Sequence, residues 1–172
     1  MHGEEFLQAT LGAMDLVHNL ARRLLRDEHA AEDLVQETYL HAYDAWVKHR
    51  RPDNVEPWMA TICLNLARSE MRRRRRRPDE VLDPEPGLER AGSSDVAAEA
   101  MHRIRVAAVH RALWKLPEEQ RVAVTLMDLC GLTAAETAKV MRSPRGTVLS
   151  RVHRARKALA VLVRGEVDQR EP

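Results

Sequence analysis

Residues 133–162 read TAAETAKVMRSPRGTVLSRVHRARKALAVL, and this stretch predicts two helices joined by a short turn. Thr133 and Glu136 have the spacing of a capping box, which places the start of a helix at Thr133. The run MRSP then interrupts the helical pattern, because Pro144 suits the first turn of a new helix and Ser143 is placed to cap it. We therefore expect a helical hairpin with a tight turn.

The second helix of this hairpin is amphipathic. Its apolar stripe consists of Val148, Val152, Ala155, Leu159 and Leu162, at three- and four-residue steps. The other face carries Arg145, Thr147, Ser150, Arg151, Arg154 and Lys157. A cationic face without interleaved acids favours a helix-turn-helix whose second helix reads the major groove from its N-terminal half. An ordinary helical hairpin with a solvated charged face is the alternative.

The length and charge distribution limit what the rest of the chain can be. A chain of 172 residues with 44% hydrophobic residues can form one domain or two small ones with real cores. The net charge of +2 conceals basic blocks at 68–77 and 142–157 and an acidic stretch at 79–99. A nearly neutral chain of this kind can still present strongly positive surfaces to a polyanion.

Several other classes of protein are disfavoured. The chain has no apolar run of membrane-spanning length, and its first residues lack the pattern of a signal peptide, so we expect a cytoplasmic protein. Cys63 and Cys130 lie among apolar helical neighbours and form no metal-type cluster. They are interpreted as small buried hydrophobes, with a disulfide or redox switch as the alternative.

The first half of the chain predicts three helices. The first covers residues 4–26, and the second runs from about residue 30 to 48. The polar side of the second is acidic, with Glu32, Asp33, Gln36 and Glu37, and aromatic residues lie nearby. Such a face could dock a basic protein surface, although a merely solvated face is the alternative.

A third helix begins near Pro57 and ends in a run of arginines. Its apolar stripe of Trp58, Met59, Ile62, Cys63 and Leu66 leads directly into six arginines at 72–77. Adjacent arginines repel one another, and a polyanion relieves that repulsion. Trp58 near the positive charge suits the stacking of unpaired bases. A solvated or nonspecific basic patch is the alternative.

The second half follows a linker. Residues 79–94 are rich in proline, glycine, serine and acids, without an apolar period. A helix then ends at Leu116, and another begins at Pro117 with acids in its first turn. This next helix contributes Val122, Leu126 and Leu129 to the core, and Gly131 is placed to end it. We therefore expect an all-α fold of two small helical domains, 1–77 and 95–165, joined by a flexible acidic linker, 78–94. The helix-turn-helix belongs to the second domain.

Two groups of motifs resemble a known family. AEDLVQETY at 31–39, Pro57-Trp58 and Asn65-Leu66-Ala67 before the arginines resemble region two of bacterial sigma factors of the extracytoplasmic-function (ECF) class. LPEEQR at 116–121 and GTVLSRVHRAR at 146–156 resemble region four of the same class. Both groups occur in the order expected of a sigma factor without the intermediate domain. Together with the linker they cover nearly the whole chain.

The resemblance implies a role for three sets of residues. Glu32, Asp33, Gln36 and Glu37 would bind the clamp helices of RNA polymerase. The melted minus-ten strand would be held by Asn54, Trp58, Asn65, Arg68, Arg72, Arg73 and Arg76. The duplex minus-thirty-five element would be read by Arg145, Thr147, Ser150, Arg151 and Arg154. Leu149, where the family often has lysine, and Ser69, where it often has an acid, depart from the pattern.

These observations predict a transcription initiation factor. It would bind core RNA polymerase, direct it to specific promoters and assist DNA melting, with promoter DNA as duplex and single strand among its partners and an anti-sigma factor as a further candidate. We expect no cofactor, no metal and no membrane insertion, and nucleoid association when the protein is bound to polymerase. A stand-alone helix-turn-helix regulator is the alternative. An enzyme is disfavoured because His102, His110 and His153 lack partners at metal spacing and are interpreted as solvated.

Overall fold

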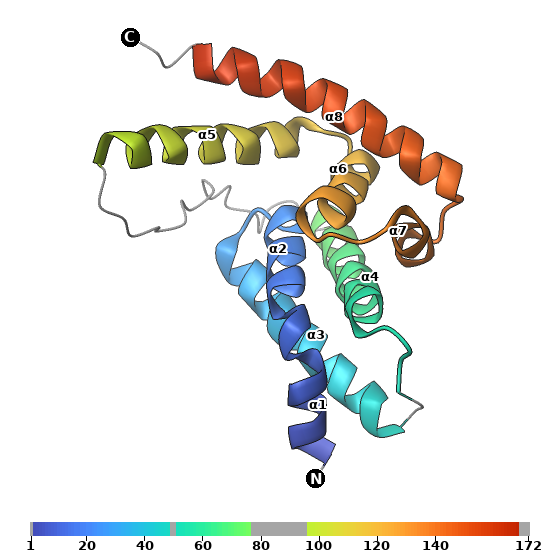
Figure 1. The fold of residues 1–172 in the computed structure, drawn as a ribbon. Helices are drawn as coiled ribbons and strands as arrows, with labels where there is room; N and C mark the ends of the chain where they lie inside the picture. Colours follow the sequence, from blue (N-terminus) through green and yellow to red (C-terminus); the bar gives the residue numbers. More distant parts are fainter. Residues whose placement is uncertain (1, 49–50, 77–95, 169–172) are drawn as a thin grey trace.

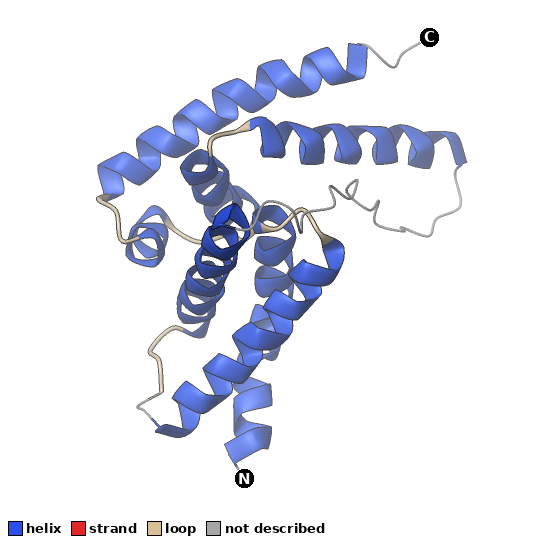
Figure 2. Cartoon of the chain, turned by 180° about the vertical axis from the view of Figure 1, so that it is seen from behind, coloured by secondary structure: helices blue, strands red, loops and turns tan. Residues whose placement is uncertain are grey.

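The computed structural model describes residues 2–48, 51–76 and 96–168, and the regular structure in these ranges is helical (Figure 1, Figure 2). The first half contains α1 (His2–Thr10), the 3-10 turn η1 (Leu11–Ala13), α2 (Met14–Leu24), α3 (Glu28–Lys48) and α4 (Val55–Arg76). The second half contains α5 (Val96–Lys115), α6 (Glu118–Val124), the π-helical turn η3 (Thr125–Leu129), α7 (Ala134–Met141) and α8 (Arg145–Asp168). The predicted linker, Arg77 and loop residues 49–50 lie outside the described residues. The prediction of an all-α fold with two helical domains is confirmed.

The predicted helix over residues 4–26 is broken near its middle. The hydroxyl of Thr10 donates a hydrogen bond to the carbonyl oxygen of Phe6 at 2.8 Å, a type of contact that bends helices, and the 3-10 turn η1 follows. The bend turns Phe6 toward α3. There its ring packs edge-on against Tyr39, Tyr43 and Trp46, at centroid distances of 6.2, 5.3 and 5.7 Å. α1 is therefore attached to α3 by aromatic contacts.

The helices α2, α3 and α4 surround one core. Asp27 caps α3, because its Oδ1 accepts hydrogen bonds from the backbone N–H groups of His29 at 2.9 Å and Ala30 at 3.3 Å. α3 buries Ala31, Leu34, Thr38, Ala42 and Trp46, and α4 buries Met59, Ala60, Cys63, Leu64 and Ala67. The buried residues of α3 lie on one face of the helix, and its acidic side is left in solvent.

The second half departs from the predicted pattern at one turn. α6 starts directly after Pro117, as predicted, but η3 continues it as a π-turn. A π-turn contains more residues than an α-turn, which rotates the side chains that follow. Leu129, predicted to face the core, is therefore 43% exposed. Gly131 has a φ of 74°, the left-handed conformation that ends a helix, as predicted.

The helix-turn-helix has the predicted capping box. The N–H of Glu136 donates to the Thr133 hydroxyl at 3.2 Å, and the N–H of Thr133 donates to the Glu136 carboxylate at 2.8 Å. The prediction that Ser143 caps the next helix is wrong. The N–H of Val148 bonds to the carbonyl oxygen of Pro144, and the Ser143 hydroxyl instead accepts a hydrogen bond from Arg151. The predicted stripe of α8 is buried at Val148, Val152 and Ala155.

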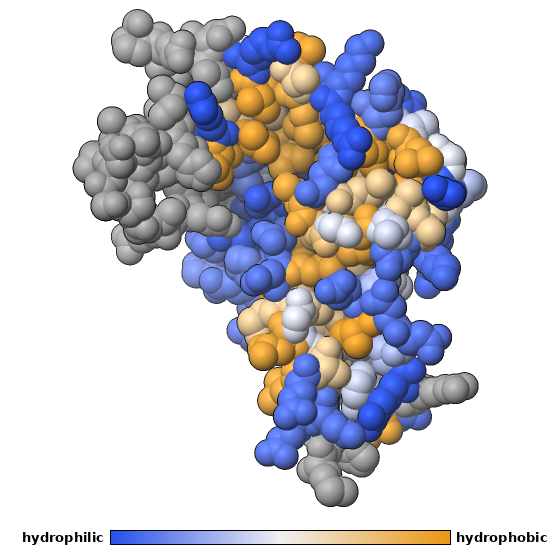
Figure 3. Space-filling view, in the orientation of Figure 1, coloured by the Kyte–Doolittle hydropathy of each residue, from blue (hydrophilic) through white to orange (hydrophobic). Residues whose placement is uncertain are grey.

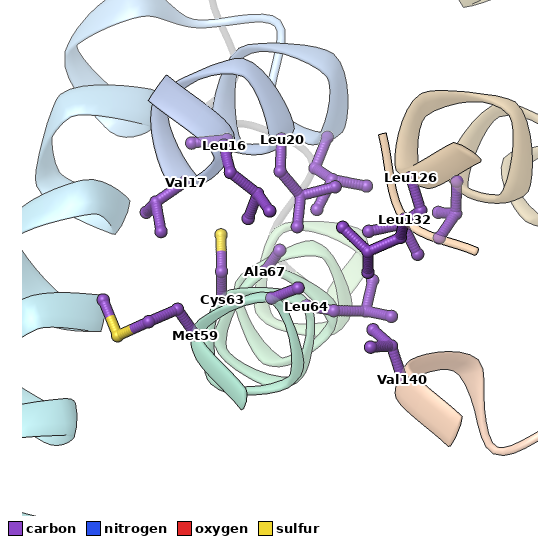
Figure 4. Close-up of a cluster of buried hydrophobic side chains, with 14 of the residues drawn as sticks. Leu16, Val17, Leu20, Met59, Cys63, Leu64, Ala67, Leu126, Leu132 and Val140 are labelled. Carbon is purple, nitrogen blue, oxygen red and sulfur yellow. The ribbon is translucent and has the colours of Figure 1, made fainter. Parts of the chain in front are cut away.

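The two halves share a hydrophobic core. Leu16 and Leu20 of α2 and Leu64 of α4 belong to the same buried cluster as Leu126, Leu132 and Val140 of the second half (Figure 4). Apolar residues also extend from the upper helices onto the lower ones on the face in Figure 3. A smaller cluster of Leu113, Leu116, Val124 and Ala155 joins α5, α6 and α8. The second half therefore lies directly on α2 and α4.

Candidate nucleic-acid interface

The N-terminal half of α8 presents a polar face to solvent. Because Val148 and Val152 are buried, Arg145, Ser150 and Arg154 are exposed on the other side of the helix, with Thr147 half-buried beside them. The hydroxyl of Ser150 donates to the carbonyl oxygen of Thr147 at 2.9 Å. Arg154 donates to the Ser150 carbonyl oxygen at 3.2 Å. These contacts are local to the helix and leave the guanidinium of Arg145 and much of Arg154 accessible.

Arg151 is oriented differently from the other residues predicted to read DNA. Its side chain is 22% exposed, and it donates to the Ser143 hydroxyl at 3.0 Å. The same guanidinium nitrogen lies 3.0 Å from Oε2 of Glu119 in α6. Arg151 thus faces the body of the second half in this arrangement, whereas Arg154 faces solvent.

The arginines near the end of α4 are partly neutralised within their own helix. Glu70 accepts two hydrogen bonds from Arg73, at 2.8 and 3.0 Å, and one from Arg74 at 2.8 Å. The hydrogen bond from Arg73 is the main reason that the pKa of Glu70 falls to about 2. Arg72 donates a hydrogen bond to the Ser69 hydroxyl at 3.0 Å. Ser69 therefore contacts an arginine of the same helix.

Other side chains predicted to hold the melted strand contact the second half. Arg68 lies 2.8 Å from Oε1 of Glu119. Asn54 donates to Oε1 of Glu136 at 2.8 Å. Arg75, which was not among the predicted site residues, pairs with Glu118 at 2.8 Å. The expectation that a polyanion neutralises the arginine run is therefore incomplete, because carboxylates of the same chain already pair with some of its arginines.

The remaining residues of this set divide into exposed and packed positions. Asn65 and Arg76 are exposed, and Arg76 has no ion pair among the described residues. Trp58 is half-buried, with its ring centroid 6.3 Å from that of Trp46. Trp58 therefore contributes to the core of the first half, and only part of its ring remains available for stacking on a base.

The acidic face of α3 is open. Glu32, Asp33, Gln36 and Glu37 are all exposed, and within the described ranges none of them forms a hydrogen bond or ion pair. Large apolar side chains continue the surface along the same helix: Leu40, Tyr43 and Val47. Exposed apolar groups beside unpaired acids are typical of a protein-docking surface.

Comparison with known proteins agrees with this arrangement. The sigma-70 region 2 family model matches residues 13–77, and the sigma-70 region 4 family model matches residues 107–159. The chain is 33% identical over 147 residues to the RNA polymerase sigma-H factor of Pseudomonas aeruginosa, covering 80% of this chain and 75% of the relative. It is 34% identical over 148 residues to the ECF RNA polymerase sigma factor SigM of Mycobacterium tuberculosis, covering 86% and 71%.

The chain belongs to the ECF family of RNA polymerase sigma factors.

Other relatives of the sigma factor differ in length. The ECF sigma factor SigE of Mycolicibacterium smegmatis is 39% identical over 147 residues, which are 84% of this chain but 56% of that relative. Among solved structures, the sigma factor RpoE of Bartonella quintana, in complex with the anti-sigma factor NepR, superposes with a TM-score of 0.77. It is 28% identical, and the match covers 94% of this chain and 98% of that one.

Groups for other chemistry were sought among the residues that the structure describes. Within residues 2–48, 51–76 and 96–168 no cluster of three metal-binding side chains was found, and no helix there is long and apolar enough to cross a membrane. Burial raises the pKa of the Cys63 and Cys130 thiols to about 12, and both are free. The interpretation of His110 as a solvated residue is wrong, because it is half-buried with its ring edge-on to Trp114.

Sequence reasoning missed the acids of the second half. Glu118 and Glu119 were interpreted only as residues that favour the start of α6, and Glu136 only as a capping residue. Each one also contacts the first half or α8. Local spacing gave no signal for these contacts, since the partners lie 32 residues away for Glu119 with Arg151 and up to 82 residues away for Glu136 with Asn54.

Proposed function

We propose that this chain is an alternative sigma factor that binds core RNA polymerase, directs it to specific promoters and assists DNA melting. The observation that carries the proposal is the occurrence of both sigma regions, in order, with one basic surface in each. We assign region 2 to residues 1–77, the linker to 78–94 and region 4 to 95–165. Each region binds DNA weakly by itself, and their linkage on one polymerase raises the effective concentration of the second contact.

In this proposal each exposed surface binds a different partner. The open acidic face of α3 meets the clamp of polymerase, which supplies the basic partner that this face lacks within the described chain. Asn65, Arg72 and Arg76 of α4, with Asn54, Trp58, Arg68 and Arg73, hold the melted minus-ten strand. Arg145, Thr147, Ser150, Arg151 and Arg154 of α8 contact the duplex minus-thirty-five element, where an arginine can donate two hydrogen bonds to a guanine.

The cellular setting follows from the same proposal. The sigma factor acts in the cytoplasm and joins the nucleoid when bound to polymerase. An anti-sigma protein is a further proposed partner, because the similar RpoE structure is a complex with one. The chain carries out no catalysis of its own in this role, since bond formation belongs to polymerase.

Run-off transcription tests the proposal. Purified core polymerase with this chain should produce discrete transcripts from a library of genomic fragments, and core polymerase alone should not. Absence of any additional promoter-specific product would overturn the proposal. A stand-alone regulator would also fail to co-purify with core polymerase, whereas a sigma factor should co-purify with it and should be displaced by excess of another sigma factor.

A further inference from the structure

The loop that joins α3 to α4 is attached to α1 by an ion pair. The guanidinium of Arg51, in this loop, donates a hydrogen bond to Oε2 of Glu5. Glu5 lies in the first turn of α1, 46 residues earlier in the chain. α1 and the end of α3 lie together at the end of the molecule opposite α5 and α8 (Figure 1, Figure 2). The ion pair therefore connects the first helix to the start of a loop that ends at Asn54, one of the residues assigned to the melted strand.

The same arginine also lies over an aromatic ring. Cζ of Arg51 is 5.3 Å from the centroid of the Trp46 ring, within the range of a cation–π contact. Trp46 is buried, and the centroid of its ring is 5.7 Å from that of Phe6. Because Phe6 directly follows Glu5, two adjacent residues of α1 contact the arginine and the ring that it covers. Arg51 is thus held by a carboxylate and by a ring that is itself packed.

The aromatic contacts continue from this point into the candidate site. The ring of Trp46 lies 6.3 Å from that of Trp58, and the two planes are inclined at 49°. Trp58 is half-buried in α4 and was assigned to the melted strand. A continuous set of contacts therefore runs from Glu5 through Arg51 and Trp46 to Trp58. Its first two members are not among the residues assigned to DNA.

The exposure of the ion pair indicates where its effect should be measured. The side chains of Arg51 and Glu5 are 58% and 48% exposed, and an ion pair in such a position contributes little to the stability of a fold. Binding, however, requires the ordering of any loop that contacts the ligand, and a contact that orders the loop beforehand lowers that cost. The Glu5–Arg51 pair should therefore affect strand binding more than unfolding.

We propose that Glu5 and Arg51 are positioning residues for the minus-ten strand: α1 holds the α3–α4 loop, through Arg51, in the conformation that presents Asn54 and Trp58 to an unpaired base. The inference rests on the proposed function, since the loop can be positioned for a strand only if a strand binds there. Glu5 acts through Arg51 and contacts no DNA itself. The first helix thereby contributes to promoter selection.

The test compares Glu5→Gln and Arg51→Gln with Glu4→Gln. Glu4 is the neighbouring exposed acid of α1 and has no ion pair among the described residues. Core polymerase with each full-length variant transcribes the promoter found by run-off transcription and copies of it with one minus-ten base replaced. The ratio of the two transcript yields should fall about threefold for Glu5→Gln and for Arg51→Gln and should not change for Glu4→Gln.

This ratio separates positioning from stability. Loss of folded protein lowers both yields and leaves the ratio unchanged. The corresponding ratio for a replaced minus-thirty-five base should stay the same in all variants. The double variant of Glu5→Gln with Arg51→Gln should show no larger fall than Arg51→Gln alone, because the two residues act through one contact. A wild-type ratio in Glu5→Gln would overturn the inference, and a fall in Arg51→Gln alone would make Arg51 a direct strand contact.

The loop can be observed in the free chain without DNA. The heteronuclear NOE of the backbone amides of Arg51, Asp53 and Asn54 reports their motion on the picosecond-to-nanosecond timescale. It should fall in Glu5→Gln and should equal the wild-type value in Glu4→Gln. An unchanged NOE in Glu5→Gln contradicts the anchoring of the loop, whatever the transcription result.

The proposed function is judged separately. If the wild type gives promoter-specific transcripts and the minus-ten ratio is the same in all variants, the positioning inference falls and the sigma-factor function stands. If the wild type gives no promoter-specific transcript while the NOE falls in Glu5→Gln, the proposed function falls. The role of Glu5 and Arg51 in promoter reading then falls with it, and only the attachment of the loop to α1 stands.

Discussion

At the scale of single residues, Arg151 and Arg154 lie on the same helix but in different environments. Arg154 is exposed beside Ser150, and Arg151 is paired with Glu119. Each base contact made by an arginine contributes roughly 1–3 kcal/mol of discrimination. We therefore expect Arg154→Ala and Arg151→Ala each to lower run-off transcription from a cognate promoter by about tenfold.

Arg164→Ala is the matched control for these variants. Arg164 is exposed in the last turns of the same helix, distant in sequence from the N-terminal half. Its replacement should leave the transcript yield within about twofold, because it removes at most one weak phosphate contact. Normal transcription by both Arg151→Ala and Arg154→Ala would show that α8 does not read the duplex element through these residues.

The lowered pKa of Glu70 predicts how the stability of the fold depends on pH. Its pKa is lowered to about 2 in the folded chain, so its contribution is present above the unfolded value of about 4.3 and is lost as the pH falls toward about 2. The two ion pairs of Glu70 with Arg73 and Arg74, each worth about 0.3–0.5 kcal/mol, give a total of about 0.6–1 kcal/mol. Urea unfolding should show Glu70→Gln less stable by about that amount at neutral pH.

The same unfolding measurement, repeated at lower pH, can contradict this prediction. The difference between Glu70→Gln and the wild type should shrink as the pH is lowered toward the folded-state pKa of about 2 and should vanish only below it, where the Glu70 carboxyl is neutral. A difference that stays constant from neutral to acidic pH would mean that the Glu70 charge does not stabilise α4.

At the scale of elements, the start of α7 depends on a local capping hydrogen bond. The hydroxyl of Thr133 accepts a hydrogen bond from the N–H of Glu136 at the first turn. Thr133→Ala should cost about 1 kcal/mol, which lowers the melting temperature by about 2–4 °C in a chain of this size. Thr147→Ala is the control, because no capping hydrogen bond of its hydroxyl is lost there. An unchanged melting temperature would contradict the assigned cap.

Local signals of this kind explain which elements could be predicted from the sequence. Thr133 with Glu136 marked the start of α7, and the steps from Val148 to Ala155 fixed the buried side of α8. The break after Thr10 and the π-turn at η3 could not be read in the same way. The break follows a hydrogen bond from the Thr10 hydroxyl to the backbone, and η3 follows a change in backbone hydrogen bonding. Both leave the apolar spacing nearly intact, and the exposure of Leu129 was the consequence of the π-turn.

At the scale of the whole molecule, the shared core was beyond prediction. Leu16 and Leu126 belong to one cluster although 110 residues separate them along the chain, and each also fits the apolar stripe of its own helix. The residues of the candidate site were predictable one by one because the motifs are local. Their pairing with Glu119 and Glu136 was not, because it depends on how the halves meet.

The shared core predicts coupled stability. Leu64 is fully buried between the halves, and a large-to-small change at such a position costs about 2–5 kcal/mol. Leu64→Ala should therefore lower the free energy of unfolding by that amount in urea. Leu129→Ala, at an exposed position, should change it by about 0.5 kcal/mol or less. Equal effects of the two variants would contradict the shared core.

The central claim is that two basic surfaces on one polymerase-bound chain read a single promoter at a fixed separation. Inserting about five base pairs between the two elements rotates one relative to the other by about half a helical turn. With the promoter found by run-off transcription, we predict that this insertion lowers the transcript at least about tenfold and that inserting about ten base pairs does not restore it fully. A transcript yield unchanged by the five-base-pair insertion would contradict the claim.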